Sequence, residues 1–73
     1  MEYFEIIRAL REDNDLTQKQ IANMLRISQG AYSRYETNRQ GLPLDILEKL
    51  CYFYNVSADY ILGLPENLKF PKR

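Results

Sequence analysis

The stretch LTQKQIANMLRISQGAYSRYE, residues 16–36, decides the fold of this chain. It opens with coincident signals for a helix start, because Thr17 is a favourable N-cap and Gln20, three residues later, completes a capping box. Leu16 and Ile21 stand at the two positions of a hydrophobic staple. A helix is therefore predicted to begin directly after Thr17. Its inward face is expected to consist of Ile21, Ala22 and Leu25.

The second half of this stretch repeats the arrangement. Ser28 is placed as the N-cap of another helix, with Ile27 and Tyr32 as its staple. Only residues 26–28 separate the two helices, so the connection must be a sharp turn. We expect a positive φ at Arg26, because the chain has to reverse directly after Leu25. Two short helices joined in this way form a helix-turn-helix unit.

Helical patterns continue on both sides of this unit, and no segment alternates apolar and polar residues as a half-buried strand does. Residues 42–55 predict a fourth helix with Pro43 at its start and Asn55 as a left-handed stop. Ser57 then caps a short fifth helix that ends at Gly63. The apolar stripe of the first helix is Tyr3, Phe4, Ile7 and Leu10. The main apolar face of the fourth helix is expected to be Leu44, Leu47, Leu50, Cys51 and Tyr54.

The length and composition of the chain restrict both its fold and its chemistry. The 73 residues suffice for one small all-α domain, predicted over 1–64, with a carboxyl-terminal tail over 65–73. Since the chain has no histidine and a single cysteine, Cys51, we expect no metal site, no cofactor, no small-molecule ligand and no enzymatic activity. The first residues carry acids early and no long apolar run, which predicts a cytoplasmic protein without a signal peptide or membrane span.

Charge is unevenly distributed along a chain whose formal net charge is zero. From Thr17 to Gly41, four basic residues oppose one acidic residue, a net charge of +3; the rest of the chain has six basic and nine acidic residues, a net charge of −3. This local excess favours an anion-facing surface on the helix-turn-helix unit. Chance unevenness in a small protein would produce the same count.

Taken together, these segments resemble the lambda-repressor-like helix-turn-helix family of phage and bacterial transcription regulators. The resemblance covers about residues 7–63 and is carried by LR (10–11), LTQKQIA (16–22), ISQGAYSRYE (27–36), NRQ (38–40) and NVSADYILG (55–63). It implies a compact five-helix domain whose third helix enters the major groove of double-stranded DNA. The sequence departs from the family at Arg26 and Asn38, where glycine often stands, and at Gly30, where the family usually has a side chain.

The third helix has a polar face, which the resemblance assigns to base reading. On a helical wheel its outward residues are Gln29, Gly30, Ser33 and Arg34. Glutamine can bond to adenine and arginine to guanine through paired hydrogen bonds, and serine can reach a base edge or a phosphate. Gly30 is expected to let the helix start sit deeper in the groove or to leave room for a thymine methyl group. From its residues alone, this face equally fits an ordinary solvated surface.

Phosphate contacts are expected on both sides of the reading helix. Gln18 stands at the amino end of the second helix, where free backbone N–H groups favour an anion. Lys19 is either a phosphate contact or a solvated side chain. By position in the family pattern, the remaining phosphate contacts are Thr17, Asn38, Arg39 and Gln40.

Glu36 closes the third helix, where its negative charge opposes the helix dipole, and it is the only acid between Thr17 and Gly41. In the family that the sequence resembles, the arginine of the LR pair reaches this glutamate. Arg11 and Glu36 occupy those two positions. The resemblance thus implies a partly buried, bidentate ion pair that joins the first helix to the third.

The predicted function is that of a sequence-specific transcriptional regulator, acting as a repressor, with double-stranded DNA as its partner. We expect a homodimer, because a helix cannot bury residues on every side against one small core. The apolar residues left for this interface are Ile46, Phe53, Tyr60, Ile61 and Leu64. The alternative is a protein-interaction module with the same fold, such as an antitoxin-like subunit, which the zero net charge would suit.

Overall fold

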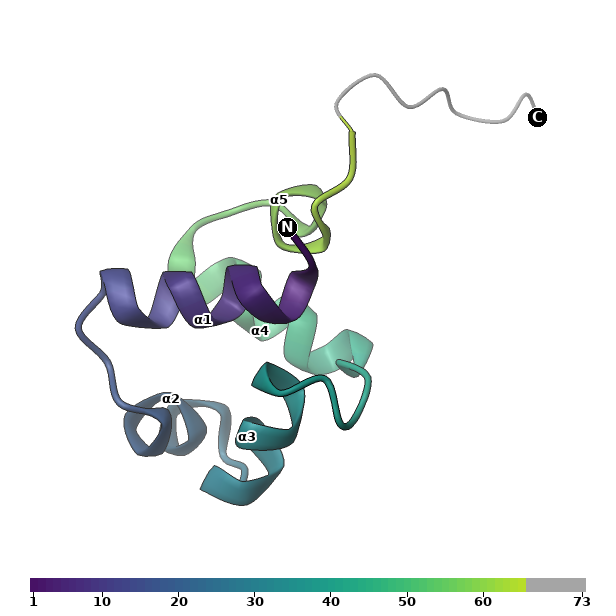
Figure 1. The fold of residues 1–73 in the computed structure, drawn as a ribbon. Coiled ribbons are helices and arrows are strands. Elements are labelled where there is room, and N and C mark those ends of the chain that lie inside the picture. Colours follow the sequence, from purple (N-terminus) through teal and green to yellow (C-terminus); the bar gives the residue numbers. More distant parts are fainter. Residues whose placement is uncertain (66–73) are drawn as a thin grey trace.

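The predicted helix-turn-helix unit is formed by α2 (Gln18–Leu25) and α3 (Gln29–Glu36), which lie together on one side of α1 (Tyr3–Asp13) (Figure 1). The structure, a computed structural model, describes residues 1–65. α4 (Leu44–Tyr54) passes behind α1 in this view, and α5 (Ala58–Leu62) lies beside the amino terminus. Within the described residues the prediction of five helices and no strand is confirmed. The predicted tail, beyond residue 65, lies outside them.

Side-chain caps start α2, α3 and α5, as the sequence predicts. The Thr17 hydroxyl accepts a hydrogen bond from the Gln20 N–H (3.1 Å), and the Gln20 side chain accepts one from the Thr17 N–H (2.8 Å), which completes the capping box. The hydroxyls of Ser28 and Ser57 each accept a hydrogen bond from the N–H three residues further on, at 3.1 and 3.2 Å. Each cap satisfies a backbone donor that its helix cannot pair internally.

Left-handed residues end several helices. Arg26 has φ 60°, Asn55 has φ 56° and Gly63 has φ 68°, and all three were predicted as turns or stops. Asp15, with φ 56°, is also left-handed and was not predicted. Gly63 is needed for a second reason, because a Cβ at this position would lie only 2.7 Å from the Met1 carbonyl oxygen. The amino terminus therefore packs directly against the end of α5.

One buried cluster with members from all five helices forms the core. Ile7 of α1 and Tyr32 of α3 are fully buried in it, which fixes the inner face of α3 against α1. The other members come from α2, α3, α4 and α5 and are Ile21, Ala22, Leu25, Tyr35, Ile46, Leu47, Leu50 and Ile61. Because α3 contributes two tyrosines to this cluster, its orientation is set by the core and leaves its opposite face outside.

The predicted inner face of α4 is wrong at two positions. Leu44, assigned to the core, is 82% exposed, whereas Ile46, assigned to a dimer interface, is 4% exposed. The buried arc is centred on Leu50, because α4 packs into the shared core from a direction that its own pattern does not specify. Leu44 is the first residue of α4 and lies at the edge of this arc. Ile61 of α5 was also assigned to the dimer interface and is fully buried.

Candidate nucleic-acid interface

The turn between α2 and α3 is closed by backbone hydrogen bonds around Arg26. The Arg26 N–H donates to the carbonyl of Asn23 (3.1 Å), and the Ile27 N–H donates to the carbonyl of Ala22 (3.0 Å). The left-handed geometry of Arg26 makes this reversal possible, although its Cβ makes the conformation costly. Since Ser28 caps α3 two residues later, the start of α3 is fixed relative to the end of α2.

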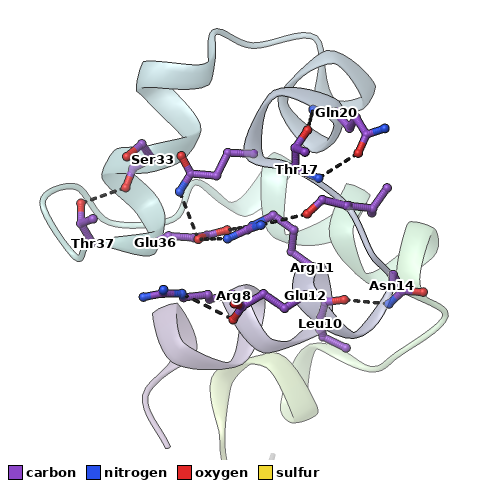
Figure 2. Close-up of polar contacts among 12 residues, drawn as sticks. Arg8, Leu10, Arg11, Glu12, Asn14, Thr17, Gln20, Ser33, Glu36 and Thr37 are labelled. Carbon is purple, nitrogen blue, oxygen red and sulfur yellow. Dashed lines mark hydrogen bonds and ion pairs between the residues drawn. The ribbon is translucent and has the colours of Figure 1, made fainter.

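The two faces of α3 differ as the sequence predicts. Tyr32, Tyr35 and Glu36 are buried. Of the four predicted base-reading residues, Gln29, Gly30 and Arg34 are exposed on the opposite face, whereas Ser33 is half-buried. The Ser33 carbonyl also accepts a hydrogen bond from the Thr37 hydroxyl at 2.8 Å (Figure 2). The outer face of α3 is therefore a polar, solvent-exposed surface, with Ser33 at its edge.

The Arg34 side chain is hydrogen-bonded to Gln40 and extends over Gly30. Its Nε donates a hydrogen bond to the side-chain oxygen of Gln40 at 3.2 Å. Its Nη1 lies 4.0 Å from the point that a Cβ on residue 30 would occupy. The structure thus brings Gly30, Arg34 and Gln40 together, although the sequence analysis assigned Gln40 to the phosphate contacts.

The three predicted phosphate contacts after α3 lie in an exposed turn. Asn38 has φ 59°, and its side-chain oxygen accepts a hydrogen bond from the Tyr3 hydroxyl of α1 at 3.2 Å. The N–H groups of Arg39 and Gln40 both donate to the Arg34 carbonyl, at 2.9 and 3.2 Å. The turn is therefore tied both to the end of α3 and to the start of α1.

At the amino end of α2 the predicted phosphate contacts have different surroundings. Thr17 and Lys19 are exposed, whereas Gln18 is half-buried. The side-chain amide of Gln18 donates to Glu36 Oε1 at 3.2 Å. Gln18 therefore belongs to the buried polar contact between α1 and α3 through its side chain, while its backbone stands in the first turn of α2.

The predicted ion pair between Arg11 and Glu36 is confirmed (Figure 2). Arg11 Nε donates to Glu36 Oε2 at 2.7 Å and Nη2 donates to Oε1 at 3.1 Å, so the pair is bidentate. The third nitrogen, Nη1, donates to the Leu16 carbonyl at 2.8 Å, which also ties the pair to the loop before α2. Since only 13% of the Arg11 side chain and 2% of the Glu36 side chain are exposed, the pair is shielded from water and salt.

Burial and hydrogen bonding oppose each other at Glu36. Burial alone would raise the pKa of the Glu36 carboxyl, but the hydrogen bonds from Arg11 and Gln18 outweigh it and hold this pKa below its usual range. The hydrogen bond to Glu36 raises the pKa of Arg11 in turn.

Two tyrosine hydroxyls, of Tyr32 and Tyr54, are buried without a hydrogen-bond partner among residues 1–65. Burial raises the pKa of Tyr54 to about 12 and raises that of Tyr32 as well. The polar cluster therefore holds one fixed negative charge, neutralised by one arginine.

Three contacts of this site were missed by the sequence analysis: Gln18 with Glu36, Tyr3 with Asn38, and Arg34 with Gln40. No periodic signal marks the first two, since each joins different helices or loops. The third contact joins Arg34 and Gln40, six residues apart, across the left-handed turn at Asn38. The asparagine at this position was the one sequence signal for that turn. Among the helices of residues 1–65, none has the length and apolar character needed to cross a membrane.

The chain is similar to a known protein family and to several individual proteins. A family model described as helix-turn-helix matches residues 7–61. An uncharacterized HTH-type transcriptional regulator of Bacillus subtilis, YobD, is 40% identical over 65 residues, which are 89% of this chain and 58% of the relative. The cryptic phage CTXphi transcriptional repressor RstR of Vibrio cholerae is 40% identical over 68 residues, a match that covers 86% of this chain and 61% of the relative.

A third relative, the antitoxin PezA of Streptococcus pneumoniae, is 35% identical over 57 residues, which are 78% of this chain and 36% of the relative. The chain thus spans between 36% and 61% of the length of these three relatives. The likeness concerns the helical domain described above.

Proposed function

The chain belongs to the lambda-repressor-like helix-turn-helix family of transcriptional regulators, and on that premise we propose that it represses transcription by binding double-stranded DNA through α3. One observation carries this proposal. The inner face of α3 is locked into the core, while its outer face offers Gln29 and Arg34, two side chains that read base edges, to the solvent. A helix held in this way can enter the major groove without rearrangement of the domain.

In the proposed complex, Gln29 and Arg34 read bases and the neighbouring residues set the register. Gln29 suits adenine and Arg34 suits guanine, each pair contributing about 1–3 kcal/mol of discrimination. Ser33, at the edge of the face, contacts a base or a phosphate. Gly30 keeps the helix start narrow. Phosphate contacts fix the register without reading the sequence directly. We assign them to Thr17, Gln18, Lys19, Asn38 and Arg39, whereas Gln40, predicted from the sequence as a further phosphate contact, lies against Arg34.

The amino end of α2 supports the proposed phosphate contact. The Gln20 N–H is occupied by the Thr17 cap, whereas the N–H groups of Gln18 and Lys19 have no hydrogen-bond partner among the described residues. Free N–H groups at a helix start attract an anion. Because the Gln18 amide nitrogen is bound to Glu36, we assign the phosphate contact of Gln18 to its backbone.

The proposed active form is a homodimer, with two copies of α3 in successive major grooves about 34 Å apart. Of the residues first assigned to the interface, Phe53, Tyr60 and Leu64 remain exposed. Tyr52, next to Phe53, is a further exposed aromatic residue, and both line an apolar hollow beside Met24 of α2. Exposed aromatic residues of this kind are enriched at protein interfaces.

A second candidate is a protein-interaction module. It is favoured by the similarity to PezA, which is named an antitoxin, and by the same exposed aromatic residues. In either role we propose a protein without enzymatic activity, and for the DNA-binding role a location in the cytoplasm, where bacterial and phage operators lie.

Selection of bound sequences from random duplex DNA tests the DNA-binding proposal. We expect enrichment of one sequence, whose affinity falls steeply when the salt concentration is raised, because phosphate contacts release counterions. A chain that enriches no sequence and binds DNA with no salt dependence would overturn the proposal and favour the protein-interaction module.

A further inference from the structure

We infer that Gln40 is a positioning residue for Arg34, and that Gly30 keeps free the space in which the Arg34 guanidinium is held. The inference rests on the proposed function, in which Arg34 reads a base. It assigns Gln40 a role in sequence discrimination, whereas a phosphate contact would affect all sequences alike.

The guanidinium of Arg34 has enough donors to bind Gln40 and a guanine at the same time. A guanidinium has N–H groups on Nε and on two Nη atoms. Nε donates to the Gln40 side-chain oxygen at 3.2 Å. The edge formed by the two Nη atoms is then left for a guanine, whose O6 and N7 accept a pair of hydrogen bonds from arginine. Gln40 thus occupies the donor that end-on recognition of guanine does not need.

The backbone after α3 brings Gln40 back to Arg34. The N–H groups of Arg39 and Gln40 both donate to the Arg34 carbonyl, at 2.9 and 3.2 Å. This closure requires the left-handed conformation of Asn38, with φ 59°. The Tyr3 hydroxyl holds the Asn38 side chain from α1. Because residue 40 is placed by these contacts, its side chain needs to order only its own rotamer to reach Arg34.

Gly30 lies one helical turn before Arg34 and leaves space for the Arg34 side chain. Side chains on a helix lean towards its amino end, so the side chain of residue 34 extends over residue 30. A Cβ on residue 30 would lie 4.0 Å from Arg34 Nη1, which is ordinary contact. Alanine would therefore fit, whereas a longer side chain turned towards residue 34 would compete with the guanidinium for this space.

The test compares the affinities of each protein for two duplexes as a ratio. A substitution that weakens binding to both duplexes equally leaves this ratio unchanged. Wild-type protein is first used to select its preferred duplex, and the base pair read by Arg34 is identified as the one whose preference disappears in Arg34→Ala. The ratio compares affinity for this duplex with affinity for a duplex changed only at that base pair. It is measured for Gln40→Met, which keeps the length but loses the oxygen, and for Gln40→Glu, which keeps an acceptor. Arg39→Ala is the matched control in the same exposed turn.

We expect Gln40→Met to lower the ratio about fivefold, the equivalent of one net hydrogen bond. Gln40→Glu should lower affinity for both duplexes, because it adds negative charge near phosphates, and should keep most of the ratio. Arg39→Ala should lower both affinities and leave the ratio unchanged. In an Arg34→Ala background, Gln40→Met should have no further effect on the ratio.

If Gln40→Met and Arg39→Ala behave alike, lowering both affinities with no change in the ratio, Gln40 is a phosphate contact and the inference is wrong. A wild-type ratio of one at every base pair would overturn the proposed function itself, and this inference with it. The wild-type measurement therefore tells the two failures apart.

Discussion

Arg11 and Glu36 are 25 residues apart in the sequence and meet in a bidentate ion pair between the end of α1 and the end of α3, with Arg11 Nε 2.7 Å from Glu36 Oε2. The pair holds α3 to α1, the helix that precedes the helix-turn-helix unit. It also neutralises the one acid of α3, which would repel phosphates in the proposed DNA complex. The orientation of α3 and its proposed role therefore depend on the same contact.

Removal of either partner should strongly destabilise the domain, because the other charge is left buried. We expect losses of about 3–5 kcal/mol for Arg11→Met and for Glu36→Leu. The double variant should lose much less than the sum, since two apolar side chains of similar volume can pack together. Chemical denaturation of all four proteins measures the coupling. Additive losses would show that the two side chains do not interact.

The same pair predicts how stability depends on pH. The pKa of Glu36 in the folded protein lies below its ordinary value of 4.5, so the unfolded chain binds the proton more tightly. The stabilisation is therefore complete at pH values above 4.5 and is lost as the pH falls through the lower, folded pKa. The difference in unfolding free energy between wild type and Glu36→Gln should be constant at neutral pH and should narrow in acid. A difference that stays constant into strong acid would contradict the assignment.

Arg26→Gly should leave the stability of the domain unchanged or increase it. Arginine at φ 60° bears a steric cost that glycine lacks, of the order of 1 kcal/mol, partly offset by the greater freedom of glycine in the unfolded chain. Thermal melts should therefore show an unchanged or higher midpoint, with a uniform loss of DNA affinity from the missing charge. Asn55→Gly is the matched control, with a smaller gain, because asparagine tolerates φ 56° well. A lower midpoint for Arg26→Gly would show that its side chain contributes contacts that outweigh the strain.

Substitutions of the proposed base-reading residues and of the proposed phosphate-binding residues should have different effects on sequence preference in DNA-binding assays. Gln29→Ala and Arg34→Ala should each weaken binding and relax the preferred sequence by about 1–3 kcal/mol at one position. Arg39→Ala should weaken all sequences about equally and reduce the salt slope by about one. Quantitative gel shifts on selected and scrambled duplexes at several salt concentrations distinguish the two patterns. An Arg34→Ala variant with unchanged affinity and preference would show that the reading face is elsewhere.

The proposed dimer interface consists of exposed apolar side chains at the end of α4 and in and after α5. Sedimentation equilibrium at high concentration should show a dimer for the wild type. Tyr60→Glu should shift the protein to a monomer without loss of folding, because this side chain is 57% exposed. A wild-type chain that stays monomeric both alone and on DNA would exclude the dimer.

The helix starts and the polar outer face of α3 were predictable because their signals are local. Thr17 with Gln20, and Ser28 with the Ala31 N–H, are contacts between residues three apart, so the identity of those residues is enough to place the helix starts. The connection after Leu25 is only three residues long, and its shortness alone predicted a left-handed conformation at Arg26. The Arg11–Glu36 pair was predicted only through the family resemblance, since nothing in the pattern relates two residues so far apart.

The sequence by itself determined where the helices start and stop and which side of α3 is polar, because capping, turn geometry and helical periodicity depend on neighbours within a few residues. Only the tertiary structure decided that Ile46 is buried and Leu44 is exposed, that the Gln18 side chain turns to Glu36, and that Arg34 is held by Gln40. The physical reason is that burial of one arc of a helix, and the partner of a polar side chain, depend on how the packed helices are oriented. That orientation is set by the shared core around Ile7 and Tyr32, to which every helix contributes.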